Sequence, residues 1–292
     1  MSLMSDYLYH YTSQKNLDNI LSSREIWFTN LNDFNDKLEK QYFKRIYHRV
    51  ILIAKRSNPN SIFIQSLPDH IDYENNQKHF INFSRSKFQE ANMHYYEKLS
   101  IESACDYYIL CFSKQRNNKY LHKNYGKSSN NLLSMNMSLF YEDLYSYIGM
   151  IYSSSKIHFK SKNSSLLELG KDITFSRSDF HYNSNLSFGP FLWGDVTYER
   201  KKQSKNLLKL ISMYEDKYNK SINLVNISDL VKTLLYDLEI YSLMYKKRYP
   251  FKKEKEFRVV IPIANFVKEE IIINNGMKKL VFPIKNFEVV KW

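Results

Sequence analysis

The sequence predicts an α+β protein in which helices pack around a mixed or antiparallel central sheet. Short runs with strand-like alternation lie near both ends of the chain, and long segments with helical spacing separate them. An Asn275-Gly276 pair marks a hairpin near the end of the chain. The 292 residues are 43% hydrophobic and 25% charged, which is typical of a globular protein with a sizeable core. We expect a single domain over residues 1–292, with residues 153–250 as an insertion or helical subdomain.

The N-terminal segment alternates short strands with helices. Tyr7–Tyr11 and Glu25–Thr29 are expected strands, and Ser13 is expected to cap a helix over Lys15–Ser22. A long helix is expected over Asp36–Arg56. Its apolar face is expected to carry residues at helical spacing: Leu38, Tyr42, Ile46, Val50 and Ile53.

The rest of the chain repeats this alternation of helices and strands. Three helices are expected, over Gln77–Ser100, Lys202–Lys220 and Ile227–Lys246. Four strands are expected before the second of these helices: Tyr107–Ser113, Leu133–Phe140, Ile148–Tyr152 and Trp193–Tyr198. Three more are expected near the end: Phe257–Ile263, Glu270–Asn274 and Lys279–Val281. The last two flank the Asn-Gly pair and are expected to form its hairpin.

Several common kinds of site are excluded by residue spacing. The six glycines lie too far apart for a Walker loop or a dinucleotide-binding fingerprint. The chain has no His-Glu-x-x-His or Gly-x-Ser-x-Gly motif, and Cys105 and Cys111 lack the spacing of metal ligands, so no metal site is predicted. Without an apolar signal region or a run of about eighteen apolar residues, we expect a cytoplasmic protein with no membrane segment.

The formal net charge is +13, and aromatic residues make up 16% of the chain. A surplus of this size attracts polyanions such as nucleic acid, anionic lipid or a nucleotide. Scattered Lys and Arg residues are also typical of an ordinary solvated face, so charge alone does not select a ligand.

The first candidate constellation is Leu8-Tyr9-His10-Tyr11-Thr12, a strand that ends in histidine just before a Ser-capped helix. This order places the His10 imidazole near a sheet edge, where it can contact a ligand. A histidine packed in an aromatic cluster explains the same pattern.

The second constellation lies where a loop after Pro250 enters a strand. On an extended strand Glu254, Glu256 and Arg258 share one face, and two carboxylates beside a guanidinium can orient a polar ligand. A carboxylate held near a sugar can also stabilise a developing oxocarbenium ion. The alternative is a solvent-facing charged edge strand, which discourages aggregation.

Together these motifs resemble the bacterial family called domain of unknown function 2971. The resemblance spans almost the whole chain and rests on five short motifs in order: Phe34-Asn35-Asp36 with Glu39, Cys111-Phe112-Ser113, the aromatic-rich Tyr120–Gly126, Val196-Thr197-Tyr198, and the closing Glu254, Glu256 and Arg258. Asn35-Asp36 also suits a cap for the long helix. One departure is that Leu121 precedes His122, where the family usually has tryptophan.

The opening motif, with its following Leu-x-x-Ile-Leu helix, is also similar to the first motif of ADP-ribosyltransferase-like proteins. That resemblance implies that NAD is a substrate and that His10, Tyr11 and Thr12 belong to its binding site. His10 would hold ribose hydroxyls, and either Tyr42 or Tyr125 would stack on nicotinamide.

The same resemblance assigns the late carboxylates to catalysis. Glu256 would be the catalytic carboxylate, and Glu254 would orient the acceptor. Arg258 or Lys252 would meet phosphate. Nearby cationic groups, Lys255 among them, would keep Glu256 ionised.

Three functions follow from these observations. The first is an NAD-dependent ADP-ribosyltransferase or NAD glycohydrolase that acts on a protein or nucleic acid. The second is a non-catalytic nucleic-acid or nucleotide-binding module, which the charge and the aromatic residues favour. The third is a structural or partner-binding protein in which the acidic and basic residues of the second constellation only hold a core network.

Overall fold

The computed structural model describes residues 7–33, 37–71, 78–88, 94–126, 129–154, 158–160, 166–168, 173–174, 182–183, 186–187, 191–220, 226–246, 248–264 and 271–292. The chain divides into two compact units. Unit 1 comprises Met1–Phe34, His79–Gly194 and Glu254–Trp292, and unit 2 comprises Asn35–Lys78 and Asp195–Lys253. The expected subdomain over residues 153–250 overlaps unit 2, but unit 2 also draws on a segment near the N-terminus.

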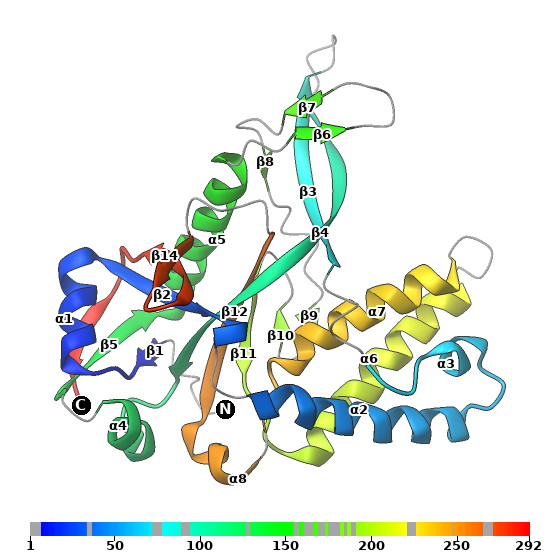
Figure 1. Cartoon of the computed structure of the whole chain (residues 1–292), viewed down its shortest axis with the longest axis horizontal. Helices are drawn as coiled ribbons and strands as arrows, with labels where there is room; N and C mark the ends of the chain where they lie inside the picture. Colours follow the sequence, from blue (N-terminus) through cyan, green and yellow to red (C-terminus); the bar gives the residue numbers. More distant parts are fainter. Residues whose placement is uncertain are drawn as a thin grey trace. The chain divides into compact units, whose positions relative to one another are not determined.

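Unit 1 contains the strands and four of the described helices (Figure 1). Its helices are α1 (Gln14–Ser23), the 3-10 helix η1 (Leu31–Asp33), α4 (Lys119–Tyr125) and α5 (Met137–Ser154). Its first strands are β1 (Tyr7–His10), β2 (Glu25–Asn30), β3 (Lys78–Phe88), β4 (His94–Ser113) and β5 (Asn131–Asn136). Short strands follow: β6 (His158–Lys160), β7 (Leu166–Glu168), β8 (Ile173–Thr174), β9 (Tyr182–Asn183), β10 (Leu186–Ser187) and β11 (Leu192–Asp195). The last strands are β12 (Glu256–Ala264), β13 (Ile271–Asn274), β14 (Met277–Pro283) and β15 (Glu288–Lys291).

The main sheet runs in the order β13-β14-β2-β4-β12-β11-β10-β9, and its long central strand is β4. β1 and β3 also pair with β4, and β5 joins β1 to β15. The pairings of β4 with β1, β2 and β12 are antiparallel. The predicted α+β class with an antiparallel central sheet is therefore confirmed.

One face of this sheet forms the core of unit 1. Alternate residues of β4 and β12 point to it, and they pack with residues of α1 and α5 in one buried cluster. Its members include Tyr108, Leu110 and Phe112 of β4, Phe257, Val259 and Ile261 of β12, Leu17 of α1, and Phe140, Leu144 and Ile148 of α5. The Ser13 hydroxyl accepts a hydrogen bond from the Asn16 backbone N–H, so the predicted cap of α1 is confirmed.

The predicted hairpin near the end of the chain is also confirmed. Asn274 pairs with Met277, so Asn275 and Gly276 form a two-residue turn between β13 and β14. Their φ angles are 50° and 74°, the left-handed conformation that this turn type requires and that Asn and Gly adopt most readily.

Unit 2 is helical. It contains α2 (Lys37–Ser57), α3 (Ile62–Ser66), α6 (Arg200–Lys220), α7 (Ile227–Ser242) and α8 (Arg248–Phe251). α2 contacts α3, α6 and α7, and α6 contacts α7. The 3-10 helix η3 (Lys252–Glu254) lies where the chain passes back to unit 1. The three long helices expected in this part of the chain are confirmed.

The buried face of α2 differs from the one predicted. Over the part of α2 whose burial is described, Tyr42 to Ser57, the buried residues are Phe43, Ile46, Tyr47, Val50, Ile51 and Ala54. Ile53, which was expected on the apolar face, is 50% exposed. The prediction followed one row of apolar residues, whereas the buried stripe also includes the row beside it.

Two expected elements have the wrong type. The helix expected over Gln77–Ser100 is replaced in the described part by β3 and the first half of β4, which pair with each other. This segment is rich in aromatic residues, which favour strands. The strand expected over Ile148–Tyr152 is instead the last part of α5. Buried Phe140, Leu144, Ile148 and Ile151 follow a helical spacing that continues through it.

Among the helices of the described ranges, none has the length and apolar character needed to cross a membrane. The Phe34-Asn35-Asp36 motif, and with it the expected cap of the long helix, lies outside the described residues.

Candidate functional site

The two ends of the chain meet at the end of β4. Ser113, the last residue of β4, pairs with Tyr9 of β1 on one side and with Glu256 of β12 on the other. The three residues therefore form one row across three adjacent strands, and neighbouring strands lie about 5 Å apart. The first and second constellations, which are separated by almost the whole sequence, come together here.

Glu256 and Arg258 form a buried ion pair on β12. The Arg258 Nε lies 2.5 Å from the Glu256 Oε1, and Arg258 Nη2 lies 3.5 Å from the other carboxylate oxygen. The two side chains are 0% and 6% exposed. Because both charges are removed from water, each is stabilised in the folded protein only by the other charge and by further hydrogen bonds. The alternative of a solvent-facing edge strand does not hold, because β12 lies between β4 and β11 in the sheet and both side chains are buried.

Glu254 does not share this strand face as expected. It ends η3, and Lys255 between it and β12 has a φ of 45°, a left-handed conformation that turns the chain. Glu254 is nevertheless buried, at 4% exposure. Its backbone carbonyl accepts from the Asn118 side chain at 3.0 Å, and its carboxylate accepts from the Tyr125 hydroxyl at 3.4 Å. Two residues assigned to the site, Glu254 and Tyr125, are thus in contact.

His10 lies on the opposite face of the sheet from Glu256. Leu8 and His10 alternate with Tyr9, and the His10 ring packs edge-on against Phe112 at 5.8 Å between ring centroids. The His10 Nδ1 lies 3.0 Å from the Cys111 carbonyl oxygen. Burial lowers the pKa of His10, and the hydrogen bond to this carbonyl opposes that shift only in part. The imidazole is therefore neutral at pH 7, with Nδ1–H as the donor.

Tyr11 holds the segment that follows β4. Its buried hydroxyl lies 2.7 Å from the Gln115 carbonyl and 2.6 Å from the Arg116 carbonyl, and it accepts from the Asn118 backbone N–H at 2.9 Å. Burial is the main reason that the pKa of Tyr11 is raised. Thr12 beside it is also buried. These contacts give Tyr11 a structural role in positioning the start of α4.

The remaining residues assigned by resemblance lie in unit 2. The Tyr42 hydroxyl donates to the Gln203 Oε1 at 2.8 Å, which joins α2 to α6. Lys252 forms an ion pair with Glu199, with 2.6 Å between Nζ and Oε1. Of the two tyrosines considered for nicotinamide stacking, only Tyr125 belongs to the same unit as Glu254 and Glu256.

The chemistry available at this end of β4 is that of a buried charge network. The carboxylate of Glu256 is occupied by Arg258, and the imidazole of His10 faces away from it. Over the described ranges, no group of three or more His, Cys, Asp or Glu side chains is arranged to hold a metal ion.

A second candidate site is the cationic surface of unit 2. This unit has twenty-one Lys and Arg residues against twelve Asp and Glu residues, a net charge of +9 out of the +13 of the chain. Unit 1 is larger but carries only +4. The charge surplus is therefore concentrated in the helical unit.

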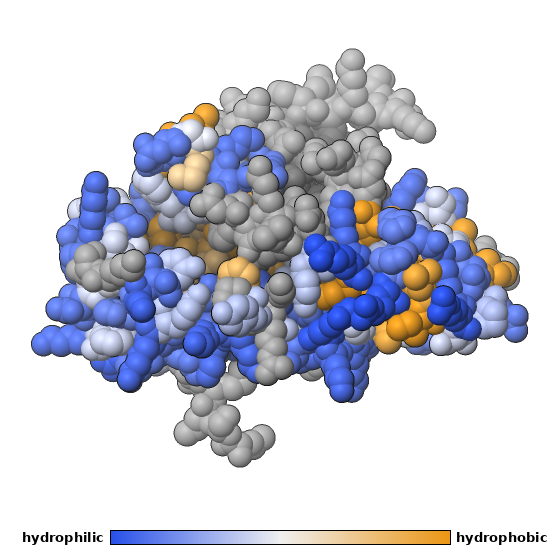
Figure 2. All heavy atoms as spheres, turned by 60° about the horizontal axis from the view of Figure 1, so that its bottom comes forward, coloured by the Kyte–Doolittle hydropathy of each residue, from blue (hydrophilic) through white to orange (hydrophobic). Residues whose placement is uncertain are grey.

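Two helices display this charge. The exposed face of α2 carries Lys44, Arg45, Arg49 and Arg56, and the sequence from residue 40 to 57 contains no Asp or Glu. The exposed face of α6 carries Lys201, Lys202, Lys205 and Lys209. Spacings of three, four and seven residues place these side chains in stripes along each helix. Figure 2 shows deep blue, strongly hydrophilic residues gathered beside orange, hydrophobic ones on one part of the surface.

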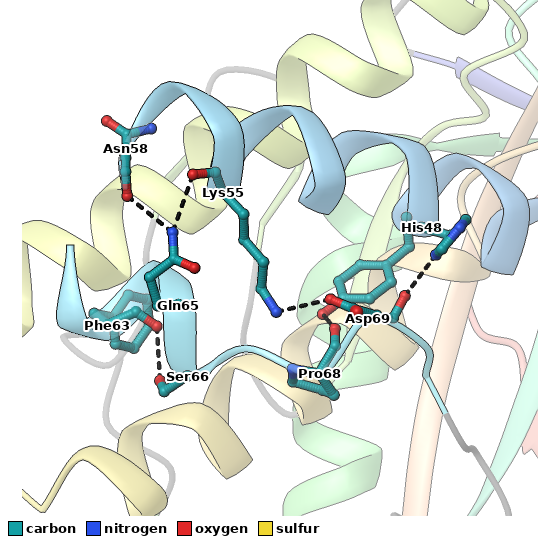
Figure 3. A network of polar contacts seen from close by, with 9 residues as sticks. His48, Lys55, Asn58, Phe63, Gln65, Ser66, Pro68 and Asp69 are labelled. Atoms are coloured by element: carbon teal, nitrogen blue, oxygen red, sulfur yellow. Dashed lines mark hydrogen bonds and ion pairs between the residues drawn. The ribbon is translucent and has the colours of Figure 1, made fainter. Parts of the chain in front are cut away.

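A polar network fixes α2 to the chain after it (Figure 3). Lys55 binds the Asp69 carboxylate at 2.7 Å, and the Gln65 amide donates to the carbonyls of Lys55 and Asn58. The His48 Nδ1 lies 3.0 Å from the Asp69 carbonyl oxygen. Lys55 holds the pKa of Asp69 below its usual value, so this carboxylate stays ionised. The basic stripe is thus carried by a helix whose C-terminal half is held in place.

Sequence reasoning identified the charge surplus but missed its location on α2. The signal that reveals it is the absence of acidic residues over eighteen positions of a helix whose other face is apolar.

No protein-family model, curated protein or solved structure matches this chain. The resemblance to domain of unknown function 2971, and the more distant one to ADP-ribosyltransferase-like proteins, therefore stay predictions that rest on the motifs.

Replacing Glu256 with alanine should destabilise the protein by about 3–5 kcal/mol, because Arg258 is then left buried without its carboxylate. Replacing both residues with methionine should recover most of this loss. Thermal or urea unfolding measures both effects. As a control, Glu199→Ala breaks the exposed pair with Lys252 and should cost less than about 1 kcal/mol. An unchanged midpoint for Glu256→Ala would show that the pair has no structural role.

The lowered pKa of His10 predicts a pH dependence of stability. In the unfolded chain histidine titrates near pH ~6.5, whereas in the folded protein His10 takes up a proton only at lower pH. Stability is therefore full above about pH 6.5 and falls as the pH drops below it. His10→Asn keeps a donor for the Cys111 carbonyl without titrating. Melting temperatures measured from pH 7.5 down to pH 5 (~0.5 unit steps) should fall less steeply for this variant, and equal slopes would contradict the assignment.

Proposed function

We propose that this protein is a nucleic-acid-binding module that uses the cationic helical surface of unit 2. The observation that carries the proposal is the concentration of charge: +9 of the net +13 lies in unit 2, with exposed stripes on α2 and α6. Each phosphate neutralised by such a side chain releases condensed counterions, which drives binding without base recognition. Arg45 and Arg49, one turn apart, are suitably spaced to meet a phosphate backbone.

The buried network of unit 1 supports a non-catalytic role. A carboxylate that is needed for bond cleavage at a ribose must reach the sugar, whereas Glu256 is engaged by Arg258 and buried. In this proposal Glu256 and Arg258 have a structural role in the sheet, and the helices of unit 2 bind the nucleic acid.

The proposal predicts that the affinity for an oligonucleotide falls steeply with salt, and that substitutions on the unit 2 surface reduce this dependence. For a single-stranded oligonucleotide, the slope of log K against log salt should fall in magnitude by about 1.4 when Arg45 and Arg49 are both replaced by alanine, because each lost phosphate contact removes ~0.7. The matched control is Lys15→Ala with Lys285→Ala, which removes the same charge from exposed positions of unit 1. Fluorescence anisotropy at several salt concentrations measures the slopes.

Two outcomes would reject the proposal. The first is an equal loss in both double variants, because binding would then follow net charge rather than the unit 2 surface. The second is binding to anionic lipid vesicles with none to oligonucleotides, which would assign the same stripes to a membrane surface.

A second candidate is the NAD-consuming reaction that the resemblance implies. It is favoured by the contact between Tyr125 of α4 and Glu254 of η3, two residues before Glu256. In this reaction the bond between nicotinamide and ribose C1′ breaks, nicotinamide leaves with the electron pair, and an acceptor attacks C1′. The ion pair of Glu256 would have to open to admit the ribose.

If this reaction takes place, the protein incubated with NAD releases nicotinamide, which chromatography detects. Glu256→Gln should then lose the release of nicotinamide, and its melting temperature shows whether the variant is still folded. A parent protein that releases no nicotinamide with water, nucleic acids or proteins as acceptors rejects this candidate.

A further inference from the structure

Unit 1 carries an ordered aromatic surface near the end of the chain. The Trp292 indole stacks on the His122 imidazole, with 3.8 Å between ring centroids and 15° between planes. Trp292 remains 43% exposed. One turn along α4 from His122, Tyr125 is 52% exposed. We call Trp292, His122 and Tyr125 the aromatic platform.

The platform is held by contacts on both sides of the stack. The Trp292 backbone N–H donates to the Asn130 carbonyl at 2.9 Å, and the Arg116 guanidinium donates twice to the Lys291 carbonyl, at 3.1 and 2.8 Å. The His122 Nε2 lies 3.0 Å from the Ser129 carbonyl oxygen. These bonds fix the backbone at Trp292 and the His122 ring on which the indole stacks, so less ordering entropy is lost on binding.

Gly126 gives the His122 ring room to lie against the backbone. A Cβ added at Gly126 would come within 3.2 Å of the His122 Cδ2 and 3.3 Å of the His122 carbonyl oxygen. An alanine here would therefore push the ring aside, which ties the geometry of the stack to this residue.

The surroundings of the platform are cationic. The described residues from 112 to 126 contain four Lys or Arg residues and no Asp or Glu: Lys114, Arg116, Lys119 and Lys123. Of these, Arg116, Lys119 and Lys123 are exposed, as is Lys291 next to Trp292. An exposed π-face among cationic side chains is the arrangement on which an unpaired base stacks while its phosphate is neutralised.

We propose that the aromatic platform binds an unpaired nucleobase of a single-stranded nucleic acid. Trp292 supplies the stacking face, His122 supports it from behind, and the cations of α4 and Arg116 meet the flanking phosphates. The site lies on unit 1, uses none of the residues of the unit 2 surface, and adds base contact to a binding mode that otherwise depends on charge. It does not require the unit 2 surface to bind.

The test compares a ten-nucleotide single strand (~10 thymidines) with an abasic strand of the same length, which keeps the phosphates but lacks the bases. Trp292→Leu should weaken binding of the intact strand about five- to one-hundred-fold and leave the abasic strand nearly unchanged. Trp292→Phe keeps an aromatic ring and should retain most of the affinity. The control Trp27→Leu removes another exposed tryptophan of unit 1 and should change neither.

Gly126→Ala is an independent variant that leaves Trp292 in place. It should weaken intact-strand binding less than Trp292→Leu does, because it displaces only the supporting ring. Melting temperatures close to that of the parent confirm that the variants are folded.

The proposal is overturned if Trp292→Leu weakens both strands equally, or neither. The two proposals fail in distinguishable ways. Loss of Arg45 and Arg49 acts on the intact and abasic strands alike, whereas loss of Trp292 changes their ratio. That ratio remains measurable even if the unit 2 surface contributes nothing.

Discussion

The structure of unit 1 depends on the register between β4 and β12. The nine pairs from Glu256 with Ser113 to Ala264 with Cys105 place the β12 residues alternately on the core face and the opposite face. Arg258 is fully buried on the face away from the core cluster, where Glu256 neutralises it. A slip of one residue would turn both Arg258 and Glu256 toward Phe112 and the apolar core, where a charged pair is very unfavourable. The cost of placing this charged pair in the apolar core therefore opposes a shift of the register between β4 and β12.

Elements that are specified by local residues were predictable from the sequence. Asn275 and Gly276 adopt the turn that their backbone preferences demand, and Ser13 caps α1 as its position before an apolar periodicity indicates. The segment over residues 77–100 was not predictable in this way, because its strands are specified by pairing with each other rather than by a clear alternation. The strand predicted over Ile148–Tyr152 rested on a short apolar run, although the helical spacing of apolar residues in α5 continues through that run.

The candidate site was predictable only in part. The meeting of both chain ends followed from the order of the motifs, but the strand face shared by Glu254 and Glu256 did not survive the left-handed turn at Lys255, which no pattern in the sequence indicates. Side chains alternate along β1, so Tyr9 lies on the same face of the sheet as Glu256, whereas His10 lies on the opposite face and packs against Phe112. The concentration of charge in unit 2 becomes visible only once its two segments are known to fold together.

The composition of unit 2 from two separate segments has a consequence for biosynthesis. The segment Asn35–Lys78 emerges from the ribosome long before Asp195–Lys253, with His79–Gly194 of unit 1 between them. Until the second segment arrives, the apolar stripe of α2 has no α6 or α7 to cover it, although its cationic face is already present. The nascent chain therefore passes through a stage in which an uncovered amphipathic helix is available to chaperones, and the helical unit can close only late in translation.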